Sequence, residues 1–448
     1  MVIQIVQFFI SLSILIILHE LGHFIPAKLF KTRVEKFYLF FDIKYSLFKK
    51  KIGETEYGIG WLPLGGYVKI SGMIDESMDK EQMNQPVQDY EFRAKPAWQR
   101  LIIMVGGVTV NFILAVIIYI GLAWAYGDQY IPMDSLKGGV WVVEEEIGDA
   151  AGLKTGDKIL AIDGTAIESF RSVFLELVNG EEVTLIRDGK TQTKDIPVGF
   201  ISKLIDDDEK ARFLAYRIPF MIGGIPEDSH NANAGLEVED QILSLGDDKV
   251  EFYDEVKSIL EKYKGQEISA EVRRVSGAVE SVNLMVSDLA TIGVLSKIPP
   301  IKTLEDLNYL GVTQVDYNFF QAFPAGIDKG VSTLGSYVKQ LKKIFNPATG
   351  AYKGVGGFAA IGSLFPDTWS WADFWSTTAL ISIILAFMNI LPIPALDGGH
   401  VMFLLYEMVS GRKPSDKFME AAQMVGFFLL IALLLFANGN DLYKFIFK

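Results

Sequence analysis

Three residues near the start of the chain have the types and spacing that metal-dependent hydrolysis requires. His19, Glu20 and His23 form the pattern H-E-x-x-H. Helix positions four apart share one face, so both imidazoles can reach one zinc ion while Glu20 lies beside its bound water. The chain has only four histidines, so this pattern is rarely produced by chance. The alternative interpretation is a pair of hydrogen-bonded histidines near the end of a membrane span.

Two histidines leave a zinc ion short of a third protein ligand, and Asp397 is the best candidate for it. It is the acidic residue of the apolar segment N-I-L-P-I-P-A-L-D-G-G-H. Pro392 and Pro394 interrupt helical hydrogen bonding there, and irregular backbone inside a membrane is tolerated only where it is buried or lines a cavity. The alternatives are a turn-forming role for Asp397 and ligation by His400.

The elements that position these residues are membrane spans. Hydrophobic residues make up 50% of the chain, and its mean hydropathy is +0.26. The H-E-x-x-H residues interrupt the first apolar stretch, where ionisable side chains are costly and are expected to be functional. No basic residues precede this stretch, so we expect a retained span and not a signal peptide. Four stretches are long enough to span, at about Val2–Leu29, Leu101–Tyr126, Phe374–Leu405 and Met424–Phe436 with an apolar tail to Phe447.

The distribution of charge predicts an orientation. Lysine and arginine concentrate in residues 28–51 and in the last short loop, at Arg412, Lys413 and Lys417. Both connections should face the cytoplasm, which places the two termini and the central region on the other side. The net charge is -13, and its acidic excess lies in residues 128–300. This acidity argues against a nucleic-acid partner, and the lack of cysteine excludes disulfides and Cys-ligated metals.

The central region contains an internal repeat. Ala151-Gly152-Leu153 recurs as Ala234-Gly235-Leu236, an offset of 83, and Gly156-Asp157-Lys158-Ile159-Leu160 aligns with Glu239-Asp240-Gln241-Ile242-Leu243 at the same offset. Two copies of this length indicate tandem small domains, because a solenoid needs at least three shorter repeats. Both copies resemble PDZ domains, which bind extended peptides by strand addition. The alternative is that the two domains are only spacers.

Two further patterns complete the predicted architecture. Residues 37–72 alternate between apolar and polar side chains and predict a small sheet. Residues 320–345 predict an amphipathic helix on the membrane surface. We therefore predict a polytopic α-helical membrane protein with four transmembrane helices, a small membrane-associated β-sheet and two tandem PDZ-like α+β domains. The predicted domains are residues 1–127, 128–217, 218–300, a linker at 301–372, and 373–448.

Taken together, these motifs resemble the site-2 protease family of intramembrane zinc metalloproteases. H-E-L-G-H in the first span and N-x-x-P-x-P-x-L-D-G-G in a late span carry the resemblance. The segments LPLGGYVKISGM and EFRAKPAWQRLIIMVGG are similar to the bacterial RseP (regulator of sigma-E protease) subgroup. One departure is GGVTVN, from Gly106 to Asn111, where the family usually has proline after glycine.

The resemblance implies a role for each residue of the site. His19, His23 and Asp397 are the implied ligands of one zinc ion per chain, and Glu20 is the implied general base. Asn389 is implied to hold the substrate backbone, and the strand-rich loop is implied to meet the substrate. The substrate-facing residues expected in that loop are Gly58, Ile59, Gly60, Gly65, Gly66 and Tyr67.

The resemblance also implies a setting and substrates. The expected enzyme is a multi-pass zinc endopeptidase of the bacterial inner membrane, with its PDZ-like domains and both termini in the periplasm. Its expected partners are the lipid bilayer and single-span membrane proteins, namely a pre-trimmed anti-sigma factor and remnant signal peptides. Two alternatives stay open: a membrane-anchored PDZ scaffold with an inactive metal site, and a zinc transporter. The intact Glu20 argues against the first, and few polar residues in the second and fourth spans argue against the second.

Overall fold

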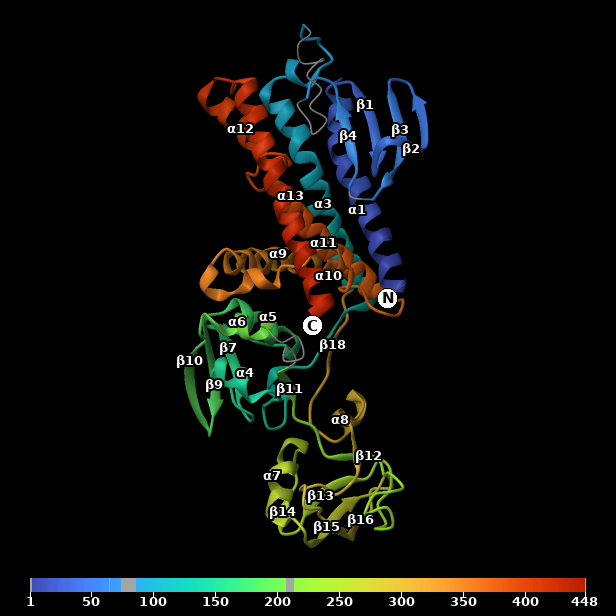
Figure 1. Cartoon of the computed structure of the whole chain (residues 1–448), viewed down its shortest axis with the longest axis vertical. Helices are drawn as coiled ribbons and strands as arrows, with labels where there is room; N and C mark the ends of the chain where they lie inside the picture. Colours follow the sequence, from blue (N-terminus) through green and yellow to red (C-terminus); the bar gives the residue numbers. More distant parts are fainter. Residues whose placement is uncertain (1, 64, 74–85, 207–212, 448) are drawn as a thin grey trace. The chain divides into compact units, whose positions relative to one another are not determined.

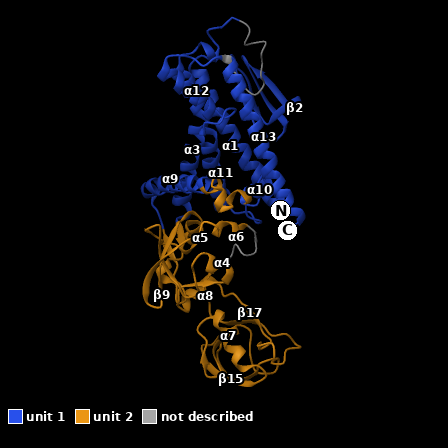
Figure 2. Cartoon of the chain, turned by 60° about the vertical axis from the view of Figure 1, so that its left-hand side comes forward, with its two compact units in different colours: residues 1–127, 316–342, 354–448 blue, residues 128–315, 343–353 orange. Residues whose placement is uncertain are grey.

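The computed structural model describes residues 2–63, 65–73, 86–206 and 213–447. Residues 1, 64, 74–85, 207–212 and 448 of the predicted domains therefore lie outside the described residues. The chain divides into two compact units, which Figure 2 shows in different colours. Unit 1 comprises Met1–Gly127, Asp316–Lys342 and Gly354–Lys448, and unit 2 comprises Asp128–Val315 and Lys343–Lys353.

Unit 1 is built on long apolar helices. Among the described residues, four helices have the length and hydropathy of a membrane span, which confirms the predicted number. Helix α3 packs against α1, α11 and α12, and it thereby connects parts of the chain that are far apart in sequence (Figure 1). The helices are α1 (Val2–Leu29), α3 (Ala97–Tyr126), α11 (Trp371–Ile390), α12 (Asp397–Ser410) and α13 (Asp416–Phe447).

The third predicted span is shorter than expected. It was predicted over Phe374–Leu405, but α11 ends at Ile390 and α12 begins as a separate helix at Asp397. The break follows from Pro392 and Pro394, which have no N–H to donate. Ala395 then adopts a positive φ of 74°, which an ordinary helix cannot contain. The proline-rich segment therefore ends α11 and allows a new helix to begin at Asp397.

A four-stranded sheet packs on the end of α1, as predicted for residues 37–72. Its strand order is β2-β3-β1-β4, with β1 and β3 parallel and the other pairs antiparallel. Strand β4 contacts α1 and lies at one edge of the sheet, with β2 at the other. The strands are β1 (Val34–Leu39), β2 (Phe41–Ile52), β3 (Thr55–Leu62) and β4 (Tyr67–Ile70).

Polar contacts hold the sheet together. Tyr67 donates a hydrogen bond of 2.8 Å to Asp42, and Lys36 donates one of 3.2 Å to the same carboxylate. Burial, followed by the hydrogen bond to Asp42, raises the pKa of the Tyr67 hydroxyl, so it stays a donor at neutral pH. These contacts link β4 to β2 across the two strands between them.

Two further helices of unit 1, α9 and α10, come between α3 and α11 in the sequence. Helix α9 (Phe319–Ile344) is amphipathic, as predicted for residues 320–345. A side chain at its Gly326 would overlap Ile120 of α3, so the two helices meet closely there. The short helix α10 (Phe358–Gly362) is capped by Asp441 of α13, which accepts N–H bonds from Gly357, Ala359 and Ala360.

Unit 2 contains the two copies of the repeat, each with the same order of elements. The first copy has β7 (Lys158–Ile162), β8 (Thr165–Ala166), α5 (Phe170–Asn179), β9 (Glu182–Arg187) and β10 (Lys190–Asp195). The second has β13 (Gln241–Leu245), β14 (Asp248–Lys249), α7 (Val256–Leu260), β15 (Glu267–Arg273) and β16 (Val279–Met285). Both copies pair these strands in the same order, so the predicted internal repeat is present in the fold.

The remaining elements of unit 2 flank the two copies. Its short helices are α4 (Glu145–Ala150), α6 (Phe200–Asp206) and α8 (Ile301–Asp306). Its other strands are β5 (Asp128–Tyr130), β6 (Val140–Val142), β11 (Leu214–Tyr216), β12 (Met221–Gly224), β17 (Leu295–Lys297) and β18 (Thr313–Val315). Strand β5 pairs with β18, which joins the two ends of the inserted segment.

An ion pair recurs at equivalent positions of the two copies. Arg187 donates to the buried Asp157, with nitrogen–oxygen distances of 2.6 and 2.7 Å. In the second copy Arg274 donates to the buried Asp240 at 2.5 Å. Each arginine also donates to a glycine carbonyl in the repeated Ala-Gly-Leu motif. The repeat therefore preserves a specific buried contact as well as a hydrophobic pattern.

Candidate metal centre

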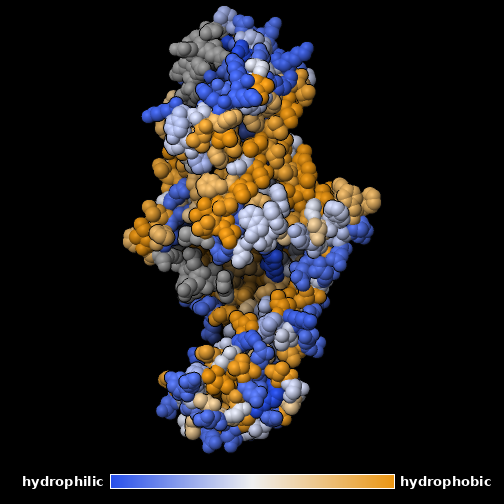
Figure 3. All heavy atoms as spheres, turned by 90° about the vertical axis from the view of Figure 1, so that its right-hand side faces the viewer, coloured by the Kyte–Doolittle hydropathy of each residue, from blue (hydrophilic) through white to orange (hydrophobic). Residues whose placement is uncertain are grey.

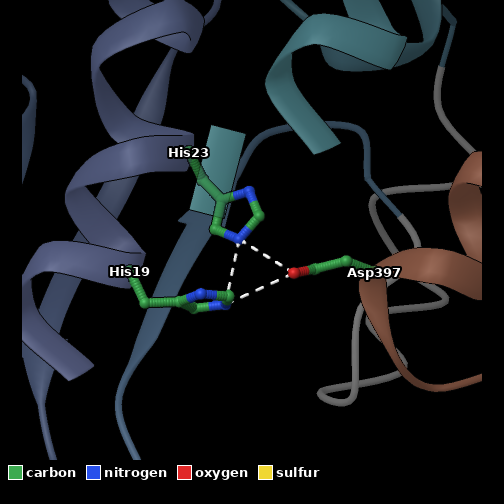
Figure 4. A group of neighbouring side chains, drawn as sticks. All are labelled: His19, His23 and Asp397. Carbon is green, nitrogen blue, oxygen red and sulfur yellow. Dashed lines mark hydrogen bonds and ion pairs between the residues drawn. The ribbon is translucent and has the colours of Figure 1, made fainter. Parts of the chain in front are cut away.

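Helix α1 presents both histidines of the H-E-x-x-H pattern on one face. Their Nε2 atoms are 3.3 Å apart, and both point toward Asp397 in Figure 4. His23 is buried and His19 is partly exposed. The spacing of one helical turn accounts for this arrangement, because side chains four apart stack over one another.

Asp397 reaches the histidines from the first turn of α12. Its Oδ2 atom lies 3.3 Å from Nε2 of His19 and 3.3 Å from Nε2 of His23. The backbone folds tightly here, because a side chain at Gly398 would overlap the carbonyls at the end of α11, and one at Gly399 would overlap Pro394. The two glycines after Asp397 are thus required for the turn that places its carboxylate.

The three ligand atoms have the geometry of a metal site. Ligands bound about 2.0 Å from a tetrahedral zinc ion lie about 3.3 Å from one another, which matches the three separations found here. Oδ2 of Asp397 is buried and has no hydrogen-bond partner among the described residues. His23 donates its Nδ1–H to the carbonyl of Ile103 at 2.8 Å, which leaves its Nε2 lone pair facing Asp397. The residues present therefore fit a bound cation.

Helix α3 contributes residues that the sequence motifs did not identify. A side chain at Gly107 would overlap both His23 and His19, so α3 can lie against the site only with glycine there. Asn111 is fully buried, and its Nδ2 atom is 3.3 Å from Nδ1 of His19. In the sequence, this segment stands out only because it lacks the proline that the family usually has after glycine. A buried polar residue in an apolar span was the signal that could have identified Asn111.

Glu20 is close to both the histidines and strand β4. It interacts electrostatically with His23, His19 and Asp397, and with the backbone of Val68 in β4. A side chain at Gly66, directly before β4, would overlap Ile16 and would contact Glu20. The edge strand of the sheet thus runs next to the candidate base.

Asn389 also reaches the site. It lies near the end of α11, and its Nδ2 atom is 3.4 Å from Nε2 of His19. His400, considered as an alternative ligand, is not part of the trio, and its Nε2 atom is 2.9 Å from Nε2 of Gln423. The structure thus brings Asn389 close to the predicted ligands, whereas it gives His400 a different polar neighbour.

The expected substrate-facing residues fall into two groups. Gly58, Ile59 and Gly60 lie in β3, which is paired on both sides, with β1 and with β2. Added side chains at the two glycines would overlap Tyr38 and the backbone of Phe41, so packing accounts for them. Strand addition at β3 is therefore blocked. Among the described residues, β2 and β4 are the two edge strands of this sheet, and β4 is the one that contacts α1. Gly65, Gly66 and Tyr67 lie at the start of that edge strand.

Comparison with known proteins agrees with this geometry. A model of peptidase family M50 matches residues 7–433. The chain belongs to peptidase family M50. It is similar to the regulator of sigma-E protease RseP of Escherichia coli K12 (28% identity over 97% of both chains) and to the regulator of sigma E protease of Haemophilus influenzae (26% over 97% of both). A protein of Rickettsia conorii whose name describes a zinc metalloprotease is 26% identical over 98% of both chains.

Family membership establishes the class of enzyme. This member of peptidase family M50 is a metalloendopeptidase with membrane-spanning helices. Its matched region includes both the H-E-x-x-H pattern and Asp397, and it covers at least part of each of the four long helices. The similarity therefore covers the whole candidate metal centre.

Proposed function

We propose that this protein is an intramembrane zinc endopeptidase that cleaves transmembrane segments of single-span proteins. The observation that supports it most strongly is the convergence of His19, His23 and Asp397, three side chains of types suited to zinc, from two separate helices. The histidines belong to a helix apolar enough to span a membrane. A hydrolytic site at that position would act on a peptide bond within the bilayer.

In the proposed site, His19, His23 and Asp397 hold one zinc ion per chain. When bound, zinc polarises the scissile carbonyl and lowers the pKa of a water molecule. Glu20 accepts the proton of that water and passes it to the leaving amine, as a general base and then a general acid. Its position beside the trio and β4 supports this role.

The substrate must be extended before it can be cleaved, because a helix hides its peptide bonds. Among the described residues β4 pairs with β1 alone, so its other edge can supply backbone hydrogen bonds to an extended segment, and β4 runs next to Glu20. Asn389, Gly65, Gly66 and Tyr67 are the proposed contacts with the substrate backbone. Gly58, Ile59 and Gly60 support the sheet from within it.

The proposed setting is the bacterial inner membrane. Lysine and arginine placement supports a cytoplasmic end near residues 28–51 and 412–417, with both termini and unit 2 in the periplasm. The repeated fold of unit 2 supports two PDZ-like domains, at residues 128–217 and 218–300. The resemblance to the site-2 protease family suggests their proposed role, which is to admit only substrates with a trimmed outer domain. The names of the relatives, regulators of sigma E, support a role in sigma-factor signalling. The proposed substrates are a pre-trimmed anti-sigma factor and remnant signal peptides.

Cleavage of a single-span test substrate by the purified protein in detergent tests this proposal. The wild type, Glu20→Gln and chelator-treated samples are compared, and zinc content is measured in each. Glu54→Gln is the matched control, because it makes the same chemical change at an exposed turn. We expect cleavage by the wild type and Glu54→Gln alone, with zinc retained in Glu20→Gln. Equal cleavage by Glu20→Gln would exclude Glu20 as the base, and zinc without cleavage in every untreated sample would favour the scaffold.

A further inference from the structure

Helix α13 is the least buried of the four long helices. Most of its described side chains are exposed, as expected for a span that faces lipid. Figure 3 shows a broad band of hydrophobic side chains over the helical part of unit 1. Among the described side chains of α13, only Gln423 and Gly426 are buried. These two positions are three apart in sequence, so they lie on one face of the helix.

Both buried positions of α13 meet the segment that leads from α11 into α12. Nε2 of Gln423 is 2.9 Å from Nε2 of His400, which belongs to the first turn of α12. A side chain at Gly426 would overlap the carbonyl of Pro394, so the two backbones approach closely there. The buried face of α13 is therefore directed at the part of the chain that carries Asp397.

The contact between Gln423 and His400 is polar, although α13 is apolar enough to span a membrane. A polar side chain is costly in lipid, and within spans such residues face the protein interior and are expected to be functional. Gln423 follows this rule, because it is only 9% exposed. Its partner is three positions after Asp397 in the same helical turn. Fixing His400 therefore fixes the turn from which the proposed third ligand projects.

The segment before Asp397 also needs support from its neighbours. Its two prolines lack an N–H group, and Ala395 has a positive φ of 74°. Backbone of this kind persists only where the surrounding structure fixes it. Pro394 is enclosed on two sides, because a side chain at Gly399 of α12 or at Gly426 of α13 would overlap it. Helix α13 thus supplies one of the two surfaces that fix this backbone.

We propose that Gln423 and Gly426 are positioning residues for Asp397. Gln423 holds the first turn of α12 through His400, and Gly426 lets α13 lie against Pro394. Together they keep the carboxylate of Asp397 at 3.3 Å from both histidines of the trio. This role rests on the proposed function, because it requires that Asp397 binds zinc. It makes zinc affinity depend on a helix that supplies no ligand.

The test uses the full-length protein in a neutral detergent, stripped of metal. Zinc affinity is measured by competition with a chelator of known affinity, and cleavage of a single-span test substrate is followed as free zinc is raised. Gln423→Leu keeps the side-chain volume but removes the amide, so we expect zinc affinity to fall about tenfold or more. Saturating zinc should restore cleavage, because the ligands and Glu20 are intact. Asp397→Ala gives the loss expected when the ligand itself is removed.

Two glycines of α13 offer a matched pair of variants. Gly426→Ala and Gly439→Ala make the same chemical change on the same helix, but nothing lies within 4 Å of the carbon added at Gly439. We expect Gly426→Ala to weaken zinc binding about tenfold, and Gly439→Ala to change it less than about twofold. Thermal unfolding midpoints show whether both variants fold. Gln423→Leu adds no volume, so it tests the same interface if Gly426→Ala does not fold.

A double variant tests whether Gln423 acts through His400. If it does, the second substitution removes nothing further, so Gln423→Leu combined with His400→Leu should bind zinc no more weakly than His400→Leu alone. Losses that add would mean that Gln423 acts by another route, which would contradict the proposed contact.

Three further results would overturn the proposal. Wild-type zinc affinity in Gln423→Leu, with affinity lost in Asp397→Ala, would show that α13 only covers the segment, and the zinc site itself would stand. Equal losses in Gly426→Ala and Gly439→Ala would show a general effect of altering α13. Wild-type affinity in Asp397→Ala would instead contradict the proposed ligand set, and a positioning role toward Asp397 would be excluded with it.

Discussion

At the scale of single residues, the two histidines differ in the group that contacts their Nδ1 atom, the ring nitrogen that does not face Asp397. His23 donates its Nδ1–H to the Ile103 carbonyl, which fixes the tautomer that a metal ligand needs. Nδ1 of His19 lies 3.3 Å from the Asn111 amide, whose Oδ1 is buried and has no partner among the described residues. A half-turn of that amide would let Oδ1 accept the Nδ1–H of His19. Asn111 would then position His19 as Ile103 positions His23.

This argument makes Asn111→Leu a test of ligand positioning. The substitution keeps the side-chain volume but removes the acceptor, so we expect zinc affinity to fall about 10- to 100-fold. Thr109→Ala is the control, because Thr109 is an exposed residue of the same helix two positions away. Competition with a chelator of known affinity measures both variants. Unchanged affinity in Asn111→Leu would mean that the amide only fills space.

The residues of the site were predictable to different degrees. His19, Glu20 and His23 could be identified because their spacing is local, and Asp397 could be identified because a carboxylate is costly in an apolar segment. Asn111 is 92 positions from His19, and no fixed spacing links the two. Only the packing of α3 on α1 brings them together, and sequence patterns do not encode such packing directly.

At the scale of elements, glycines decide whether α3 can lie against the site. Side chains at Gly22 of α1 or Gly106 of α3 would overlap the backbone of the other helix, and one at Gly107 would overlap both histidines. Two helices can approach this closely only where small residues face each other. The glycines therefore set the distance between the ligands and the helix that supports them.

Gly107→Ala is accordingly expected to damage the metal centre as well as the fold. The added methyl group has no space, so we expect unfolding to become easier by about 1–3 kcal/mol and bound zinc to be lost. Gly121→Ala on the same helix is the control, since nothing lies within 4 Å of the added carbon. There the change should be neutral or stabilise by about 0.5–1 kcal/mol. Thermal unfolding in detergent and metal analysis measure both effects, and equal behaviour of the two variants would contradict the packing argument.

The elements themselves were predicted unevenly. The long helices follow from apolar length, and the proline-rich break after Ile390 follows from Pro392 and Pro394. The order of the strands in the sheet could not be predicted, because alternation in residues 37–72 indicates strands but not which strands pair. Strand β1 pairs in parallel with β3, which encloses β3 and leaves β4 at the edge. Such non-adjacent pairing depends on contacts that no local pattern specifies.

At the scale of the whole molecule, the candidate metal centre and the repeated fold belong to different units. All the candidate ligands lie in unit 1, whereas both copies of the repeat lie in unit 2. Unit 2 is inserted between α3 and α9, and each copy has its own hydrophobic core with the recurrent Asp–Arg pair beside it. The two units should therefore lose stability independently.

Asp157→Ala tests that independence in the full chain. Removing the carboxylate leaves Arg187 without its partner in a mostly buried position, so we expect the first copy to unfold more easily by about 3 kcal/mol. Asp149→Ala, an exposed change of the same kind in the same copy, should have little effect. Hydrogen exchange with mass spectrometry can follow each unit separately, while metal analysis follows the site. We expect faster exchange in residues 158–195 of Asp157→Ala, with zinc content and exchange in α1 unchanged; loss of zinc would show that the two units fold as one.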